Sequence, residues 1–187
     1  MPDLIKIETD RLLLRQWRAE DRQPFSEMNA DPEVMKYFPA LLTREQSDLL
    51  ADRCQAFIEE RGWGLWAVEA KAEGLFIGFV GLSIPVADLP FNPCVEIGWR
   101  LSRAAWGKGY ATEAARAVLR VGFETFHLGE IVSFTSVINV KSRAVMERLG
   151  LIRDSLTFEH PRVPPGNSLR EHCLYRISYH QWISANL

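Results

Sequence analysis

The chain has 187 residues, of which 47% are hydrophobic and 25% charged, and its formal net charge is −2 at pH 7. This length suits a single domain over residues 1–187 with a substantial core, and the near-neutral charge gives no global attraction for nucleic acid or an anionic membrane. No run approaches the ~18 uncharged apolar residues of a membrane helix, and the first residues lack a signal-peptide core, so we expect the cytoplasm as the location.

The cysteines and histidines give no metal-site pattern. Cys54, Cys94 and Cys173 lie far apart and form neither a CxxC pair nor a metal-ligand spacing, so we expect three reduced, partly buried thiols. The four histidines show no such spacing either, and we expect His172 at the surface or at a sheet edge. No bound metal is expected.

The first half of the chain predicts a strand, two helices and a hairpin. Residues 11–17 are typical of a strand and 19–29 of a short helix, and Thr43 with Gln46 forms a capping box that begins a second helix. We expect Leu50, Cys54, Phe57 and Arg61 to fall on one stripe of that helix. Residues 64–70 and 75–84 indicate two strands joined by a short polar turn.

The second half alternates strands with helices before a final pair of strands. Residues 94–101 alternate between two faces, one of which carries Glu96, Gly98 and Arg100. A helix to about residue 126, a strand over 130–138, a helix capped by Asn139 and stopped by Gly150, and strands near 151–160 and 169–179 follow. The predicted order is β-α-α-β-β-β-α-β-α-β-β, which favours a mixed sheet with helices on its faces.

The stretch "LSRAAWGKGYATEA" (101–114) joins a strand to a helix through two glycines. Gly107 and Gly109 allow backbone angles that a Cβ disfavours, and the free N–H groups of the next helical turn suit a phosphate or a pyrophosphate. A P-loop is excluded because no Ser or Thr follows Lys108, and Thr112 stands where a dinucleotide fingerprint has Gly or Ala. A plain strand–helix turn remains open on the glycines alone.

Two motifs together resemble a known family. The pattern of a strand, "WGKGYATEA", a helix, a strand and "NVKSRAVMERLGL" resembles the GNAT superfamily of acetyl-CoA-dependent N-acetyltransferases, in particular its ribosomal-protein-alanine N-acetyltransferase-like branch. The resemblance implies an α+β fold with a mixed, mostly antiparallel sheet of six to seven strands, a V-shaped splay and helices on both faces. The family's Gln or Arg that opens the glycine loop is replaced here by Ala104.

The resemblance also implies how acetyl-CoA is held. The pyrophosphate would lie on backbone N–H groups of the loop, and the pantetheine arm would pair with the strand before it and contact Asn139, with Ser142 near the sulfur. The implied coenzyme-binding residues are Trp99, Arg100, Leu101, Gly107, Lys108, Gly109, Tyr110, Ala111, Thr112, Asn139 and Ser142. Capping of their helices is an alternative role for Thr112, and for Asn139 with Ser142.

The expected reaction is direct attack of a primary amine on the thioester, through a tetrahedral intermediate. Glu96 is the candidate base, acting directly or through a water, with a cross-strand ion pair as the alternative. Ser142 is the candidate acid, and Tyr175 is the second candidate unless it only packs in the core. No nucleophile elbow is present, as direct attack requires none.

The acceptor is expected to be a small-molecule amine or a protein N-terminus. Candidate acceptor-side residues are Trp17, Glu33, Tyr37, Phe38, Trp63 and the loop "HPRVPPGN", whose aromatic and acidic character suits a cationic amine, although aromatic residues also build cores. The alternative functions are a non-catalytic coenzyme-A-binding sensor and a nucleotide-binding oxidoreductase. A homodimer is a further possibility.

Overall fold

The computed structural model describes residues 4–186. The chain divides into two compact units, unit 1 with residues 1–82 and 98–118 and unit 2 with residues 83–97 and 119–187. Two strands and one helix run from one unit into the other. In the part of the chain that the structure describes, none of the helices combines the length and the apolar character that a membrane span needs.

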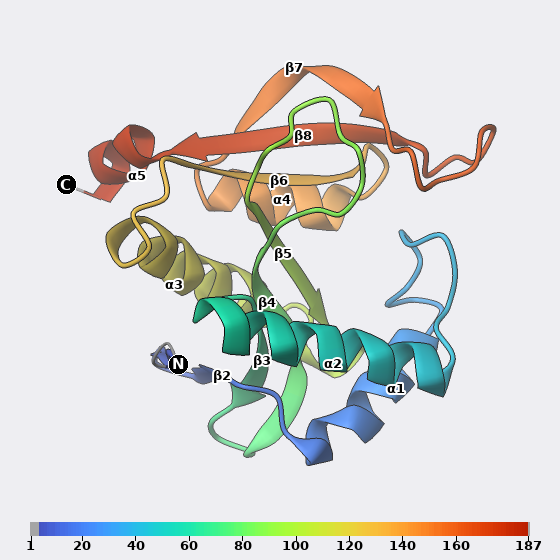
Figure 1. Ribbon diagram of the computed structural model, residues 1–187, viewed down its shortest axis with the longest axis vertical. Helices are drawn as coiled ribbons and strands as arrows, with labels where there is room; N and C mark the ends of the chain where they lie inside the picture. Colours follow the sequence, from blue (N-terminus) through green and yellow to red (C-terminus); the bar gives the residue numbers. More distant parts are fainter. Residues whose placement is uncertain (1–3, 187) are drawn as a thin grey trace. The chain divides into compact units, whose positions relative to one another are not determined.

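Unit 1 is built on antiparallel strands near the N-terminus (Figure 1). The strands β1 (Ile7–Glu8), β2 (Leu12–Arg15), β3 (Leu65–Ala70) and β4 (Leu75–Ser83) pair in chain order. The end of β5 (Glu96–Leu101) continues the unit beside β4, where Ser102 N donates to Ile77 O at 2.9 Å. The expected hairpin over residues 64–84 is confirmed.

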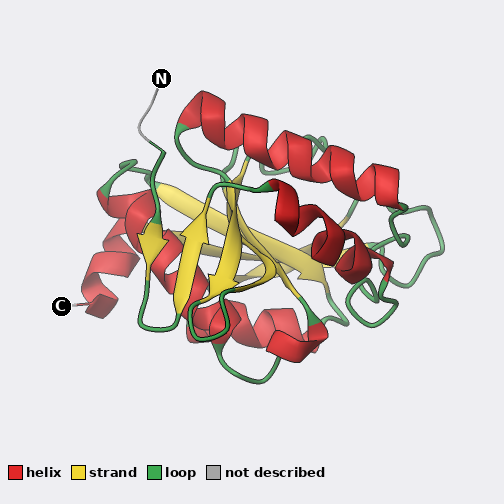
Figure 2. Ribbon diagram, turned by 90° about the horizontal axis from the view of Figure 1, so that it is seen from below, coloured by secondary structure: helices red, strands yellow, loops and turns green. Residues whose placement is uncertain are grey.

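Two helices pack beside each other in unit 1, as Figures 1 and 2 show. A 3-10 turn η1 (Ala19–Asp21) leads into α1 (Arg22–Ala30), and α2 (Arg44–Arg61) begins at the predicted capping box of Thr43 and Gln46. Of the four residues on the predicted stripe of α2, only Cys54 is buried. The buried positions are Ser47, Ala51, Cys54 and Ile58, because the helix meets its neighbours through small side chains as well as large ones.

Unit 2 contains the second set of strands, in the order β5-β6-β8-β7 (Figure 1). The start of β5 runs parallel to β6 (Glu130–Ser136) with Glu96 opposite Val132, and β8 (Glu171–Ser178) lies antiparallel between β6 and β7 (Ile152–Glu159). The helices α4 (Val140–Arg148) and α5 (Tyr179–Asn186) complete it, while α3 (Tyr110–Glu124), after the 3-10 turn η2 (Arg103–Ala105), runs through both units.

His172 is not at the surface or at a sheet edge, contrary to expectation. It lies on β8, between two other strands, with 9% of its surface exposed, and its ring is 4.8 Å from that of His160 and 5.6 Å from that of Phe158. Burial among these rings lowers the pKa of both imidazoles, that of His160 to about 4. Aromatic neighbours on adjacent strands, which the local sequence does not reveal, account for the difference.

The fold class and the order of the predicted elements are confirmed. The described residues form a mixed α+β fold with five α-helices and a large, mostly antiparallel sheet. The sheet has eight strands rather than six or seven, since the short β1 joins its edge, and α5 is a helix that the sequence patterns did not predict. Cys54, Cys94 and Cys173 are free thiols, and burial raises the pKa of each.

Candidate active site

The glycine loop of unit 1 contains two residues with left-handed backbone. Gly107 and Gly109 have φ angles of 73° and 78°, in the left-handed region that glycine adopts at little cost. A Cβ built on Gly107 meets no atom within 4 Å, so the space beside this residue is open. Directly after the loop, α3 begins at Tyr110, and the N–H groups of its first turn have no partner within the helix. These features fit a pyrophosphate group.

Tyr110, Ala111 and Thr112 form the first turn of α3, so their N–H groups belong to the helix terminus that a pyrophosphate would approach. Thr112 does not stand at the capping position that we considered for it. The helix starts two residues earlier, after Gly109, whose carbonyl accepts from Glu113 N at 3.0 Å. The alternative role for Thr112 as the residue that caps the helix start is therefore wrong.

An ion pair between Arg11 and Glu113 fixes the loop. Arg11 donates from Nε to Oε2 of Glu113 at 2.7 Å and from Nη1 to the carbonyl oxygen of Lys108 at 2.9 Å. Thr9 Oγ1 donates to Glu113 Oε1 at 2.6 Å. Burial alone would raise the pKa of the Glu113 carboxyl, but the hydrogen bonds from Thr9 and Arg11 hold it below its ordinary value. This Arg11–Glu113 clamp keeps the turn at Lys108 in place.

Glu96, the predicted base, lies at the start of β5 in unit 2. Burial raises the pKa of its carboxyl to about 8, and a weak hydrogen bond from Ser83 Oγ at 3.4 Å opposes that shift. No ion pair of Glu96 occurs within residues 4–186, so the alternative of a cross-strand ion pair is not what these residues form. A carboxyl with this pKa exchanges protons near neutral pH, as a general base must.

This raised pKa predicts a pH-dependent cost in folding stability. The carboxyl of Glu96 ionises near its ordinary value of 4.5 when unfolded and at about 8 when folded, so the folded state holds one more proton between these values. Stability should therefore fall as the pH rises across that window. We expect Glu96→Gln to raise the Tm at about pH 7 and to leave it nearly unchanged at about pH 4.

Thermal unfolding followed by circular dichroism at both pH values measures this difference. Glu73→Gln, in the exposed turn between β3 and β4, is the control that should match the wild type at each pH. A Glu96→Gln variant less stable than the wild type at neutral pH would show that the carboxyl is not penalised by burial.

Trp99, Arg100 and Leu101, which the sequence predicts as coenzyme-binding residues, close β5 in unit 1. The carbonyl of Leu101 already accepts from Trp106 Nε1 at 2.8 Å. A Cβ on Gly78 of β4 would lie 2.1 Å from the carbonyl oxygen of Arg100, so only glycine permits this approach of the two strands. The position of Arg100 therefore depends on Gly78.

Asn139 and Ser142 lie at the start of α4 in unit 2. Asn139 caps the helix as predicted: its Oδ1 accepts from Ser142 N at 3.2 Å, and its Nδ2 donates to Thr135 Oγ1 at 3.0 Å. Gly150 follows the helix with a φ of 83°, also as predicted. The hydroxyl of Ser142 has no hydrogen-bond partner among residues 4–186 and is free to serve a ligand.

Tyr175 is fully buried on β8, with 0% of its surface exposed. Its hydroxyl donates to Glu147 Oε1 at 2.8 Å and accepts from Arg143 Nε at 3.4 Å. Burial raises the pKa of the phenol, the hydrogen bond from Arg143 lowers it, and Glu147 raises it. These two hydrogen bonds join β8 to α4. To act as an acid, Tyr175 would have to break its hydrogen bond to Glu147 and donate that proton to the leaving group.

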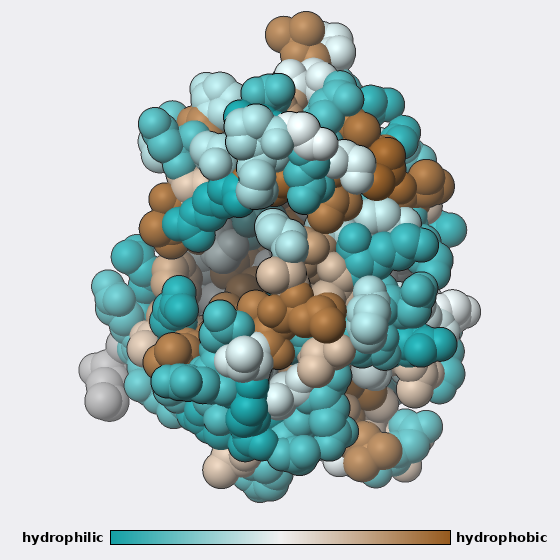
Figure 3. Space-filling view, turned by 90° about the vertical axis from the view of Figure 1, so that its right-hand side faces the viewer, coloured by the Kyte–Doolittle hydropathy of each residue, from teal (hydrophilic) through white to brown (hydrophobic). Residues whose placement is uncertain are grey.

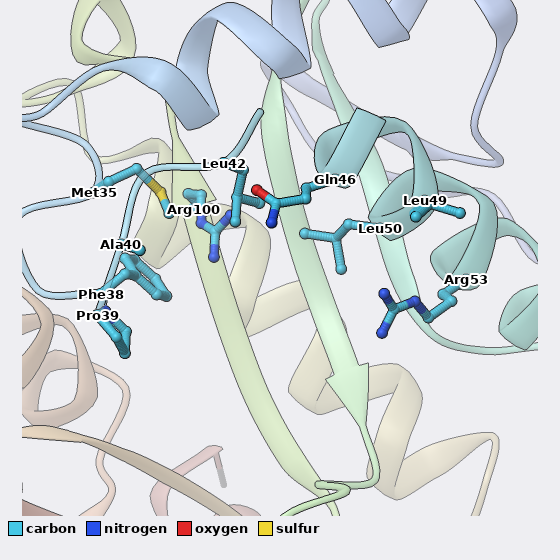
Figure 4. A pocket seen from close by; sticks show the side chains of 10 residues that line it. All are labelled: Met35, Phe38, Pro39, Ala40, Leu42, Gln46, Leu49, Leu50, Arg53 and Arg100. Carbon is cyan, nitrogen blue, oxygen red and sulfur yellow. The ribbon is translucent and has the colours of Figure 1, made fainter. Parts of the chain in front are cut away.

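Three of the expected acceptor-side residues of unit 1 lie in different environments. Trp17 belongs to the core: it is 5% exposed, donates from Nε1 to Leu65 O at 2.8 Å and packs edge-on against Phe25. Phe38, by contrast, lines a pocket of about 410 Å³ together with Arg100 (Figure 4). Glu33 is exposed outside that lining.

Three positioning residues were missed by sequence reasoning: Arg11, Glu113 and Ser83. Arg11 and Glu113 are 102 residues apart in the chain, and nothing in the local sequence pairs them. Glu113 at the fourth position of α3 is an available signal, because an acidic side chain is common in a first helical turn. Ser83 ends β4 and has no signal beyond its place in a strand.

The family model described as "Acetyltransferase (GNAT) domain" matches residues 11–152, most of the chain and parts of both units. A curated relative, the FsC-acetyl coenzyme A-N(2)-transacetylase of Aspergillus fumigatus, is 32% identical over 95% of this chain and 77% of its own.

Solved structures agree with that match. The GNAT-family acetyltransferase of Bacillus anthracis has a TM-score of 0.77 and 27% identity, over 94% of this chain and 99% of that one. RimL, a ribosomal L7/L12 alpha-N-protein acetyltransferase in complex with coenzyme A, shares the fold with a TM-score of 0.74 at 14% identity, over 93% and 98% of the two chains. With this glycine loop and these relatives, the chain belongs to the GNAT family of acetyltransferases.

Proposed function

We propose that this protein is an N-acetyltransferase that moves the acetyl group of acetyl-CoA to a primary amine by direct attack. Membership of the GNAT family supports the use of acetyl-CoA. The observation that favours a catalyst over a passive coenzyme binder is Glu96, a carboxyl with a pKa of about 8 and no counter-ion among the described residues. A binding module has no need of a proton acceptor tuned to this range.

Each unit would contribute its own groups. In unit 1, the loop from Gly107 to Thr112 would bind the pyrophosphate through backbone N–H groups, and the Arg11–Glu113 clamp would hold the loop in shape. The backbone of Trp99 to Leu101 would bind the pantetheine arm. In unit 2, Asn139 would orient the first turn of α4, and the free hydroxyl of Ser142 would donate to the sulfur.

When bound, acetyl-CoA supplies a thioester carbonyl that is open to attack. The amine nitrogen forms a bond to the carbonyl carbon, the carbon–sulfur bond breaks, and the sulfur leaves with the electron pair of that bond. Glu96 takes the proton that the amine loses, directly or through a water, and Ser142 stabilises the departing sulfur. Tyr175 is the second candidate for that last task, at the cost of its bond to Glu147.

The names of two similar proteins support an amine as the acceptor, without identifying which amine. One relative is by name an N(2)-transacetylase, and a fold neighbour is an alpha-N-protein acetyltransferase. A primary amine on a small molecule or at a protein N-terminus is therefore the proposed acceptor. We propose no metal and no nucleic acid as a participant.

Release of free thiol tests the proposal. The protein is mixed with acetyl-CoA and a panel of amino acids, peptide N-termini and polyamines, and thiol is followed while mass spectrometry detects the acetylated product. Thiol release that depends on the acceptor and matches the product supports an N-acetyltransferase. Coenzyme binding without turnover on any acceptor would favour the sensor, and no coenzyme binding at all would overturn both functions.

A further inference from the structure

Arg100 is a cation without a counter-ion. Burial lowers the pKa of its guanidinium to about 10. Within residues 4–186 no carboxylate forms an ion pair with it, and its one hydrogen bond runs from Nη1 to Oδ1 of Asn29 at 2.7 Å. Its Nε is buried and has no hydrogen-bond partner in the same part of the chain. Only one of the five N–H donors of this guanidinium therefore has a protein partner among the described residues.

Arg15, in the same unit, is a buried arginine that has carboxylate partners. Its residue is 4% exposed, and its two Nη atoms donate to Asp21 at 2.7 and 2.9 Å, while Nε donates to Glu69 at 2.8 Å. Two carboxylates compensate a single cation there. Arg100 is half-buried, and its buried Nε has no partner among the described residues. Because a buried polar atom without a partner is costly, a purely structural role does not explain this arrangement.

Asn29 orients Arg100 without neutralising it. The amide is 0% exposed, and its Nδ2 donates to the equally buried Ser47 Oγ at 2.9 Å, which leaves Oδ1 to face the guanidinium. An aspartate has the same shape and would supply the missing charge. An amide at this position therefore holds the cation in place and leaves its charge available to another molecule.

Aromatic rings cover the guanidinium without using its donors. The Cζ atom of Arg100 lies 4.1 Å from the ring centroid of Phe38 and 5.3 Å from that of Phe79. A ring attracts the cation through its face, whereas the N–H groups point outwards in the plane of the guanidinium. These contacts stiffen the side chain and preserve its capacity for a bidentate hydrogen bond to an anion.

The pocket of about 410 Å³ that Arg100 lines has no acid in its wall (Figure 4). A second cation, Arg53, lines it, and Gln46 adds an amide. The remaining lining side chains are apolar, namely Met35, Phe38, Pro39, Ala40, Leu42, Leu49 and Leu50. On the face of the molecule in Figure 3, hydrophobic side chains gather among hydrophilic ones, and in unit 1 the exposed large apolar residues include Phe38, Leu41 and Leu49.

We propose that this pocket binds the carboxylate of an amino-acid-like acceptor, with Arg100 as the residue that recognises the anion and the apolar wall as the site of its side chain. The inference rests on the proposed function, because it specifies the acceptor of the acetyl group. The sequence suggested that acidic residues such as Glu33 select a cationic amine. Glu33 does not line this pocket, so we propose selection through the carboxylate of the acceptor instead.

Binding of a product-like pair tests this without turnover. N-acetylmethionine and its uncharged amide differ only in the carboxylate, and titration calorimetry with each gives the preference for the anion. We expect the carboxylate to bind roughly 10- to 100-fold more tightly, the range that a charge-assisted hydrogen bond contributes. With methionine and methioninamide as acceptors, kcat/KM should show the same preference.

Two variants locate the preference. Asn29→Asp keeps Arg100 and the shape of its partner but supplies an internal carboxylate, so the preference should fall to about 2-fold or less. Arg100→Met removes the charge and should raise the Kd of the carboxylate alone. Arg44→Met, on α2 outside the pocket lining, is the control that should keep the wild-type preference.

Equal binding of the two ligands by the wild type, or a preference that survives Asn29→Asp, would overturn the proposal. If Arg100→Met does not fold, the wild-type titration and Asn29→Asp still decide. If the protein prefers the carboxylate but acetylates no amine, the carboxylate site is supported and the proposed acetyltransferase function is contradicted. If the protein acetylates both acceptors equally, the acetyltransferase function is supported and the carboxylate site is contradicted.

Discussion

Replacing Gly107 by glutamate is expected to raise the Kd of coenzyme A by about 100-fold or more while the protein stays folded. A Cβ at this position meets no protein atom within 4 Å, so the substitution causes no clash at that atom. Its carboxylate would stand where the pyrophosphate is expected and repel it. The left-handed φ of 73° adds a strain of about 1–2 kcal/mol, which affects stability more than binding.

Gly74→Glu is a matched control for that experiment. Gly74 lies in the turn between β3 and β4 of the same unit, has a φ of 65°, and likewise has no atom within 4 Å of a built Cβ. Both variants therefore carry the same charge and a similar backbone strain. Titration calorimetry with coenzyme A should separate them, and circular dichroism should show both folded. An equal Kd for the two variants would mean that the pyrophosphate binds elsewhere.

Glu96→Gln is expected to lower kcat/KM by about 100-fold or more, because the amide cannot accept the proton of the amine. Coenzyme affinity should change little, since Glu96 is not among the residues proposed to bind the coenzyme. Steady-state kinetics with acetyl-CoA and the best acceptor, combined with calorimetry for the coenzyme, measures the two effects separately. A large loss of coenzyme affinity with kcat intact would assign Glu96 to binding instead.

The pH profile carries a second signature of the same residue. Only the ionised carboxylate accepts a proton, so wild-type kcat/KM should rise as the pH passes about 8. Ser83→Ala should move this limb to higher pH, because the hydrogen bond from Ser83 lowers the pKa of Glu96. An acceptor amine of much lower pKa keeps the limb if Glu96 causes it. If the midpoint of the limb shifts with the pKa of the acceptor, the limb reports deprotonation of the amine and not of Glu96.

Local signals in the sequence predicted most of the secondary structure. Thr43 with Gln46 marked the start of α2, and Asn139 with Gly150 marked both ends of α4. Such signals act over three or four residues and need no knowledge of the rest of the chain. The short β1 and the terminal α5 were not predicted, because their patterns are too brief to stand out without the neighbours that they pack against.

Burial was harder to predict than the elements themselves. The stripe pattern of α2 did not show that Leu50 lines the pocket, nor that Ser47 is buried against Asn29. His172, expected at the surface or at a sheet edge, is buried on a strand that lies between two others. In each case the determining contact comes from a residue distant in sequence, which periodicity along one element cannot report.

The candidate site divides in the same way. The glycine loop and the carboxyl of Glu96 could be named from motif and position, because their chemistry is local. The neutral partner of Arg100 and the clamp between Arg11 and Glu113 join residues 71 and 102 positions apart, so only the folded chain brings them together. What a sequence motif cannot give is the set of groups that fix its geometry.

The Arg11–Glu113 clamp has a consequence for how unit 1 opens. It joins the edge of the sheet to the first turn of α3, so loosening of β1 and β2 also releases the loop at Lys108. Local opening of the N-terminal edge and loss of the loop geometry then form one cooperative event. Any ligand that binds only the intact loop suppresses that event by mass action, so its binding also raises the free energy needed to open the N-terminal strands.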